Sequence, residues 1–137
     1  KRPGARMVTA LKCLLREQGS YAGNLKGQYT PKLVEAIRSW KATKGLKVSN
    51  AWSQRNWVAL FASATANPVL KVGSTGGAVR RLQRALNAAS DEARLPITGV
   101  FDGFTDRTLR SYQARNKLEV SGVAGSQTWA ALVKGTR

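Results

Sequence analysis

The sequence contains no histidine and a single cysteine, Cys13, among its 137 residues. Without histidine the chain lacks the usual general base and the commonest metal ligand, and it has no serine–histidine or cysteine–histidine nucleophile pair. One cysteine makes neither an internal disulfide nor a thiolate metal cluster, so we expect Cys13 to be a small helix residue without a chemical role. No glycine-rich loop followed by Lys-Ser/Thr is present. These absences predict a segment with no catalytic residues, no metal site and no cofactor.

Long hydrophobic runs are also missing. No apolar stretch approaches the ~18–20 residues that a membrane-spanning helix needs, so no membrane span is predicted. The sequence has no signal-peptide pattern and begins at Lys1 without an initiator methionine. We therefore expect a processed or excised piece of a longer protein.

Acidic residues are scarce, with 7 Asp and Glu against 23 Lys and Arg and a formal net charge of +16. Such a positive field predicts an anionic partner, namely nucleic acid, acidic lipid or an anionic wall polymer. A basic surface without a specific partner is the simpler alternative. The charge is heavier at the front: residues 1–66 carry 12 basic and 2 acidic side chains, and residues 67–137 carry 11 and 5.

What the chain does contain is a repeated pattern of apolar residues. Matches at a constant offset along the sequence indicate two tandem copies of one small unit. At an offset of 71 the pairs are Val8/Val79, Leu11/Leu82 and Leu15/Leu86, and at an offset of 72 they are Tyr29/Phe101, Leu33/Thr105, Ile37/Leu109, Trp40/Tyr112, Leu46/Leu118, Trp57/Trp129 and Leu60/Leu132.

Each copy predicts three helices. The spacings of three and four residues in Val79, Leu82 and Leu86 are typical of the apolar stripe of a first helix. Thr30 followed by Pro31, and Asp102 in the second copy, are typical N-terminal caps of the second helix. The third helix is expected to begin near residue 53 in the first copy and near residue 125 in the second.

The predicted fold is therefore all-α, with two tandem three-helix bundles. The first covers residues 1–62, the second covers residues 69–137, and a linker at residues 63–68, small and polar and ended by Pro68, separates them. We expect a monomer. The matched aromatic residues are interpreted as core rather than as ligand platforms, and they are Trp40, Trp57, Tyr112 and Trp129.

The second copy resembles the three-helix peptidoglycan-binding domains that are appended to bacterial cell-wall hydrolases. The stretches that carry the resemblance are "LKVGSTGGAVRRLQRAL", "TGVFDGFTDRTLRSYQ" and "LEVSGVAGSQTWAAL", which together span nearly all of residues 69–135. The positions that fit the family pattern are Leu70, Gly73, Gly76, Val79, Leu82, Gln83, Leu86, Gly99, Phe101, Thr105, Tyr112, Gln113, Leu118, Gly122, Gly125, Thr128, Trp129 and Leu132. The second copy departs from it at Thr98, where Asp is usual, and at Asp102, where Gly is usual.

The first copy has lost most of the polar part of this pattern. Lys12 and Lys41 stand where the family has glutamine, Asn50 and Ser53 stand where it has glycine, and Asn56 replaces threonine. We expect this copy to be structural or divergent.

The resemblance implies non-catalytic binding of peptidoglycan, which would hold an attached or partner cell-wall enzyme on its substrate in a secreted or wall-associated location. Arginines, hydroxyls and backbone amides in a groove suit the carboxylates of muramyl groups or stem peptides, and the basic surface suits anionic wall polymers. Trp52, whose counterpart Ala124 is not aromatic, is a sugar-stacking candidate or else packs between the copies. The candidate ligand contacts are Arg80, Arg84, Thr98, Gly99, Asp102, Arg107, Arg110 and Trp52.

Two other functions remain open. A basic helical nucleic-acid-binding module is the alternative, in which the helix from residue 106 to residue 117 enters a major groove. Asp102 and Asp106 at the start of that helix would repel phosphate, which makes nucleic acid the less favoured partner. A structural or regulatory module that packs on a neighbouring catalytic domain is the third possibility for the first copy.

Overall fold

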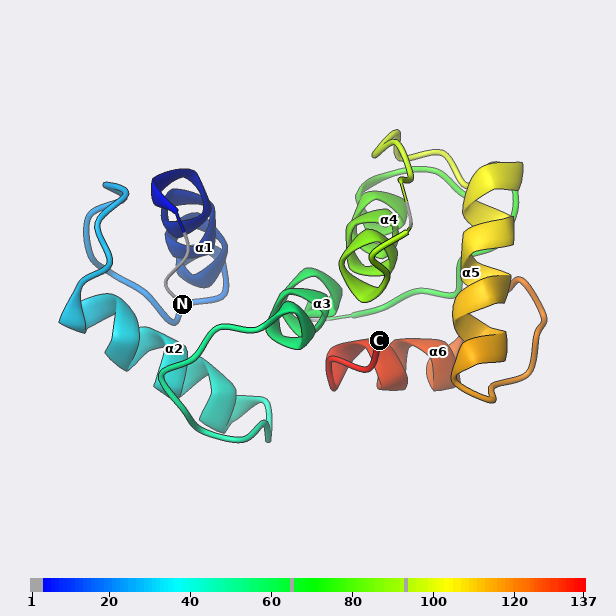
Figure 1. Ribbon diagram of the computed structural model, residues 1–137. Helices are drawn as coiled ribbons and strands as arrows, with labels where there is room; N and C mark the ends of the chain where they lie inside the picture. The colour runs from blue at the N-terminus through cyan, green and yellow to red at the C-terminus, as the bar shows by residue number, and fades with distance from the viewer. Residues whose placement is uncertain (1–3, 65, 93) are drawn as a thin grey trace. The chain divides into compact units, whose positions relative to one another are not determined.

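The structure is a computed structural model that describes residues 4–64, 66–92 and 94–137 (Figure 1). Residues 1–3 of the expected first repeat and residue 65 of the expected linker lie outside the described residues. The described residues form six helices: α1 (Ala5–Glu17), α2 (Pro31–Thr43), α3 (Gln54–Ala62), α4 (Gly77–Ala89), α5 (Gly103–Arg115) and α6 (Ser126–Val133). No strand occurs among them, which confirms the all-α prediction. None of these helices has the length and apolar character needed to cross a membrane.

The predicted helix starts are confirmed. The Thr30 hydroxyl accepts a hydrogen bond from the Leu33 backbone N–H at 3.2 Å, and Pro31 is the first residue of α2. The Asp102 carboxylate accepts the Thr105 N–H at 2.9 Å at the start of α5. Such caps satisfy backbone donors that the first turn of a helix leaves without partners.

The chain divides into two compact units, Lys1–Ser53 and Gln54–Arg137, which we call the first and second units. In the first unit, α1 and α2 contact each other (Figure 1). Their buried residues follow the predicted apolar stripes and include Val8, Leu11, Leu15, Leu33, Ile37 and Trp40. The Trp40 indole donates to the Gln18 side-chain oxygen at 2.8 Å, so the polar edge of this buried ring is satisfied.

The described residues of the second unit form four helices, α3 to α6, whereas three helices were expected for each repeat. Helix α3, expected as the third helix of the first bundle, contacts α4 and α6. Val58 and Ala62 of α3 belong to the same apolar core as Val79, Leu82 and Ala85 of α4. The small alanine side chains allow these two helices to approach closely, so the apolar face of α3 is buried in the second unit. The boundary between compact units therefore precedes α3, whereas the repeat boundaries at residues 62 and 69 stay a prediction about how the two copies are related.

The residues expected to be a linker are attached to the second unit. Arg81 of α4 donates to the Asn67 side chain at 2.7 Å and to the Ala62 carbonyl at 3.3 Å. The Trp129 indole donates to the Pro68 carbonyl at 2.9 Å. Arg81 also lies 5.4 Å from the centre of the Trp129 ring. These contacts attach Ala62, Asn67 and Pro68 to α4 and α6.

The aromatic residues meet the core prediction with one exception. Trp40, Tyr112 and Trp129 are at most 3% exposed. Trp57 is only half-buried and stacks on Phe61, with ring centroids 5.5 Å apart. Trp57 was predicted to be a core residue like Trp129, but it lies outside the buried core because the buried face of α3 is formed by its neighbours from Val58 to Leu60 and by Ala62.

Candidate functional site

A buried glutamine on α4 holds the loop that precedes α5. Gln83 is 1% exposed. Its side-chain oxygen accepts the Gly99 N–H at 3.1 Å, and its amide donates to the Val100 carbonyl and the Thr105 hydroxyl, both at 3.1 Å. This one side chain thus bonds both an N–H and a C=O group of the loop backbone, and it also bonds the first turn of the next helix. We call this arrangement the first clamp.

A second clamp repeats the arrangement one helix later. Gln113 of α5 accepts the Gly122 N–H at 3.1 Å. Its amide donates to the Val123 carbonyl at 2.9 Å and to the Thr128 hydroxyl at 3.2 Å. The two clamps use the same elements in the same order: a helix glutamine, a Gly-Val turn, and a threonine in the first turn of the following helix. A neutral amide can do this because it offers a donor and an acceptor together.

The turn glycines of both clamps lie against charged side chains. Gly99 and Gly122 have φ angles of +77° and +71°, in the left-handed region that favours glycine. A Cβ on Gly99 would lie 2.9 Å from the guanidinium carbon of Arg80, and one on Gly122 would lie 2.7 Å from a guanidinium nitrogen of Arg110. Each arginine stands three residues before its clamp glutamine and covers the loop. A side chain at either glycine would displace the neighbouring arginine from the loop and would strain the turn.

The segment before α4 connects the two clamp loops. Leu70 exchanges backbone hydrogen bonds with Ala124 in the second loop, at 2.8 and 3.2 Å. Further along, the Gly76 N–H donates to the Gly99 carbonyl at 2.8 Å, and the Phe101 N–H donates to the Ser74 carbonyl at 2.9 Å. Together with the clamps, these bonds order one loop surface from backbone that lies outside the helices.

The predicted contact residues fall into different places. Arg80, Thr98 and Gly99 come together at the first clamp, where Thr98 receives a 3.3 Å bond from Gln83. Arg110 covers the second clamp and forms an ion pair with Asp106 at 3.1 Å. Their role as ligand contacts stays a prediction.

The other predicted contact residues lie apart from this group. Arg84 is exposed on α4, and Arg107 of α5 lies 5.7 Å from the centre of the Phe104 ring. Asp102 caps α5, and the hydrogen bonds from the backbone and then the hydroxyl of Thr105 hold the pKa of its carboxyl below the usual range. Trp52 lies in the first unit with its ring 5.3 Å from that of Trp40.

Lysines occupy the clamp positions of the first unit. Lys41, 1% exposed, donates to the Ser49 hydroxyl at 3.0 Å and to the Ala51 carbonyl, the counterparts of Ser121 and Val123. Burial, with a smaller contribution from the positive charge of Arg38, lowers the pKa of Lys41. An ammonium group has no acceptor, so it cannot bind the loop N–H groups that Gln113 binds. Only the donating half of the second clamp has an equivalent here.

The first clamp position in the first unit is filled in a similar way. Lys12 is fully buried and donates to the Lys26 carbonyl at 2.7 Å. Its ammonium lies 5.7 Å from the centre of the Tyr21 ring, which is itself buried. An aromatic face stabilises a nearby cation, which is why a charged group is tolerated at this site.

Several hollows open on the second unit among the residues that the structure describes. One, about 260 Å³, lies between α5 and the connection that follows α4; we call it the α4–α5 cleft, and Ser90, Glu92, Arg94, Phe104, Ser111 and Arg115 are among the residues that line it. Another, about 340 Å³, lies beside the second clamp and is lined by residues that include Gln113, Ser121, Ser126 and Thr128. A shallow hollow of about 360 Å³ adjoins the first and shares Ser90, Glu92 and Arg115 with it.

The sequence prediction missed the α4–α5 cleft. Phe104, Thr108, Ser111 and Arg115 recur at spacings of four, three and four, which places them on one face of α5. Helical periodicity in the sequence could therefore have predicted that these four residues share a face. Glu92 and Arg94 lie in an irregular connection, so no periodic pattern in the sequence predicts that they line the cleft.

Comparison with known families bears on the segment that contains both clamps. Residues 75–132 match a family model described as "Putative peptidoglycan binding domain". The match is to a peptidoglycan-binding family. One such domain is detected, and it spans α4, α5 and all but the last residue of α6. The matched family is a binding domain rather than an enzyme. No curated protein and no solved structure matches the chain.

The segment that matches the family model does not include α3. The family match begins at residue 75, whereas the compact second unit begins at Gln54. Helix α3 and the segment up to Ser74 therefore complete the core and the loop surface from outside the matched residues. Among the residues that the structure describes, no three histidine, cysteine or carboxylate side chains gather to hold a metal ion.

Proposed function

We propose that this chain is a non-catalytic module that binds peptidoglycan and holds an attached or partner cell-wall enzyme on its insoluble substrate. The family match over residues 75–132 carries this proposal, because that segment contains both clamps and most of the helices of the second unit. The second unit is the binding unit, and the working location is the cell wall, outside the membrane.

The geometry of the clamp loops supports binding of a polar polymer. Binding loses less free energy when the contact groups are already ordered, and the clamps order the loop backbone in the unbound protein. Arg80 and Thr98 are exposed at the first clamp, where a guanidinium and a hydroxyl can bind carboxylate and hydroxyl groups of the polymer. Arg84, Arg107 and Arg110 are proposed as further contacts along α4 and α5.

The first unit has a different proposed role. Its lysines replace the clamp glutamines, and Trp52 packs against Trp40. We assign it a structural role or attraction to anionic wall polymers, which its positive charge would favour. Trp52, whose ring is half-buried, stays a candidate for sugar stacking.

Co-sedimentation of the full chain with purified sacculi tests the proposal, with a DNA mobility-shift assay in parallel. We expect saturable retention on sacculi and weak DNA binding that disappears at moderate salt. Tight DNA binding without retention on sacculi would instead establish the nucleic-acid alternative, for which the +16 net charge is the supporting observation.

The proposal also predicts that the chain releases no soluble fragments from cell walls. With no histidine in the sequence, it lacks the usual general base of hydrolases. Dye-labelled sacculi incubated with the purified chain should release dye at the rate of the buffer control. Dye release that increases with protein concentration and follows the protein through purification would show that the chain is an enzyme.

A further inference from the structure

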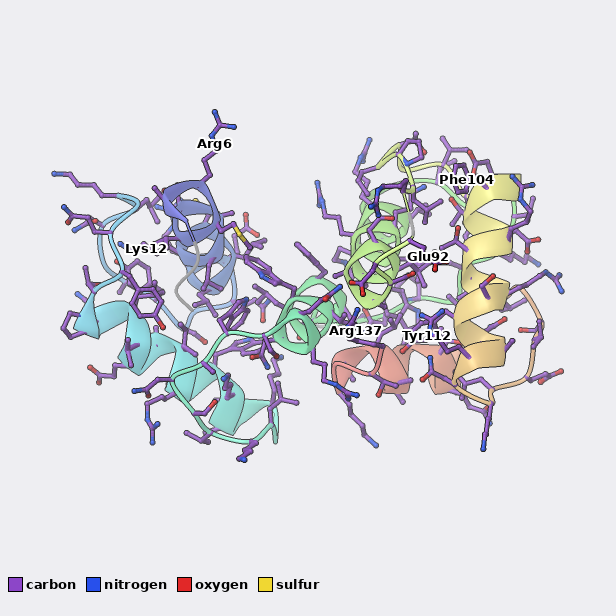
Figure 2. All side chains as sticks on the ribbon, viewed as in Figure 1. Arg6, Lys12, Glu92, Phe104, Tyr112 and Arg137 are labelled. Carbon is purple, nitrogen blue, oxygen red and sulfur yellow. The ribbon has the colours of Figure 1, made fainter. Side chains whose placement is uncertain are left out.

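We propose that the α4–α5 cleft binds the peptide stem of peptidoglycan, and that it does so by recognising a carboxylate and a free amine on the same short peptide. This inference rests on the proposed function and names the part of the polymer that the second unit recognises. The cleft lies between α5 and the connection after α4. Figure 2 shows Glu92 between α4 and α5, with Phe104 and Tyr112 on α5.

The positive side of the cleft is formed by two arginines. Arg115 donates to the Ala89 carbonyl at 3.5 Å, and its guanidinium carbon lies 5.5 Å from the centre of the Tyr112 ring. Arg94 donates to the Asp91 carbonyl at 2.8 Å. A guanidinium has five N–H donors, so the anchoring bond of Arg115 fixes its position and still leaves donors for a carboxylate.

The negative side is formed by Glu92, one of only 7 acidic residues in the chain. Its neighbour Asp91 already pairs with Arg137 at 2.9 Å and accepts a bond from Gln54 at 3.2 Å. Glu92 is exposed and lines both the cleft and the adjoining hollow. A carboxylate at this place is unfavourable for a polyanion and favourable for an amine.

Between the charged groups the cleft offers apolar and hydroxyl contacts. Leu86 and Tyr112 are buried beneath it, and Phe104 is 42% exposed on its wall. Ser111 is exposed on the same face of α5 and can bond a peptide group. A ligand that fits must therefore carry both charges close together on a partly apolar frame.

A peptide stem has this chemistry and a glycan strand does not. Stem peptides carry carboxylates together with the free amine of a diamino acid, on a backbone with small apolar side chains. The N-acetylated sugar strand carries no amine charge, and the nucleic-acid backbone carries no cation for Glu92. A cleft of about 260 Å³ is slightly smaller than most small-ligand sites, which suits only a short peptide end.

The test is a titration of the full chain with a synthetic stem peptide whose diamino acid has a free side-chain amine, followed by NMR or calorimetry. Two derivatives are compared with it, one with the amine acetylated and one with the terminal carboxylate amidated. The protein variants are Glu92→Gln and Arg115→Gln. Glu35→Gln and Arg55→Gln are the matched controls, because both residues are exposed and lie outside the cleft.

We expect each cleft variant to bind the stem peptide about two- to fivefold more weakly, as is typical for the loss of one exposed charge pair. Acetylating the amine should weaken binding to the wild type by a similar factor and have no further effect on Glu92→Gln, because both changes remove the same contact. Amidation and Arg115→Gln should show the same non-additivity. The two control variants should bind like the wild type.

Equal affinity for the free and acetylated peptides, or strictly additive losses, would overturn the assignment of this cleft. Retention on sacculi by the same preparation separates this result from the proposed function. A chain that is retained on sacculi without binding the stem peptide recognises the polymer elsewhere, so the cleft proposal fails and the proposed function stands. A chain that is not retained on sacculi refutes both.

Discussion

Lys41 is a buried cation whose bonds run to oxygens of the loop that follows its own helix. The equivalent Gln113 also accepts loop N–H groups, which the ammonium cannot do. Burial lowers the pKa of Lys41, so the charged form is disfavoured in the folded state. The first unit thus keeps the position of the clamp but loses part of its bonding.

Lys41→Gln should therefore fold at least as well as the wild type, because an amide can bond the Ser49 hydroxyl and the Ala51 carbonyl without a buried charge. Lys41→Met has a similar length and leaves both oxygens without that donor, which costs about 1–3 kcal/mol. Thermal unfolding followed by circular dichroism compares the two variants. A methionine variant as stable as the glutamine variant would show that these bonds contribute nothing.

Tyr112 gives a prediction about alkaline pH. Desolvation raises the pKa of Tyr112 to about 12, although the nearby Arg115 acts in the opposite direction. In the unfolded chain the tyrosine pKa is about 10. The contribution of this group to stability is thus fully present below pH ~10 and is lost as the pH rises towards 12, because the unfolded state loses its proton first.

The free energy of unfolding should fall more steeply between pH 10 and pH 12 for the wild type than for Tyr112→Phe, which has no group to titrate there. The phenylalanine variant also loses the 2.8 Å bond from the hydroxyl to the Thr136 carbonyl, so it starts from a lower stability at neutral pH. Chemical denaturation at a series of pH values measures both slopes. Parallel slopes would mean that the hydroxyl is not desolvated.

At the scale of elements, α3 decides where the second unit begins. The residues that belong to the same core as α4 are Val58 and Ala62, and full burial of one valine contributes ~1.5–3 kcal/mol. A fragment of residues 54–137 should unfold cooperatively. A fragment of residues 63–137, which keeps Asn67 and Pro68 but lacks α3, should unfold at least ~5 °C lower. Equal melting temperatures would show that α3 is dispensable for this unit.

The helices themselves were predictable because their signals are local. Thr30 and Asp102 predict helix starts because their side chains can cap the first turn. The apolar stripes of α1 and α4 follow the period of a helix. The partner of α3 was not predictable, because its sequence match to α6 indicates which helix it resembles and not which core it enters. The half-buried position of Trp57 was not predictable for the same reason, since the buried face of α3 depends on its partner.

The candidate site, like the fold, was predictable only where the sequence signals are local. Gly99 belongs to the family pattern, and Arg80 and Thr98, which were named as candidates beside it, lie at the same clamp in the structure. Glu92 and Arg94 were missed because they lie in a connection whose path depends on the packing of α4 against α5. A local sequence pattern does not predict contacts between residues that only the tertiary structure brings together.

At the scale of the whole molecule, charge and recognition make opposite predictions. Residues 1–66 carry the larger positive charge, whereas the family match and both clamps lie in the second unit. Long-range attraction weakens with salt because the Debye length falls to ~3 Å at 1 M, while short hydrogen bonds and apolar contacts persist. Binding that depends on the second unit should therefore outlast binding that depends on net charge alone.

The most direct test of this account is retention of the full chain on sacculi stripped of their anionic polymers, measured at 0.1 M and at 1 M salt. The account predicts that most of the protein stays in the pellet at 1 M salt and that stripping the anionic polymers changes this little. Complete release at 1 M salt, or loss of retention once the anionic polymers are removed, would contradict specific recognition of peptidoglycan and leave only the attraction of a basic protein for an acidic surface.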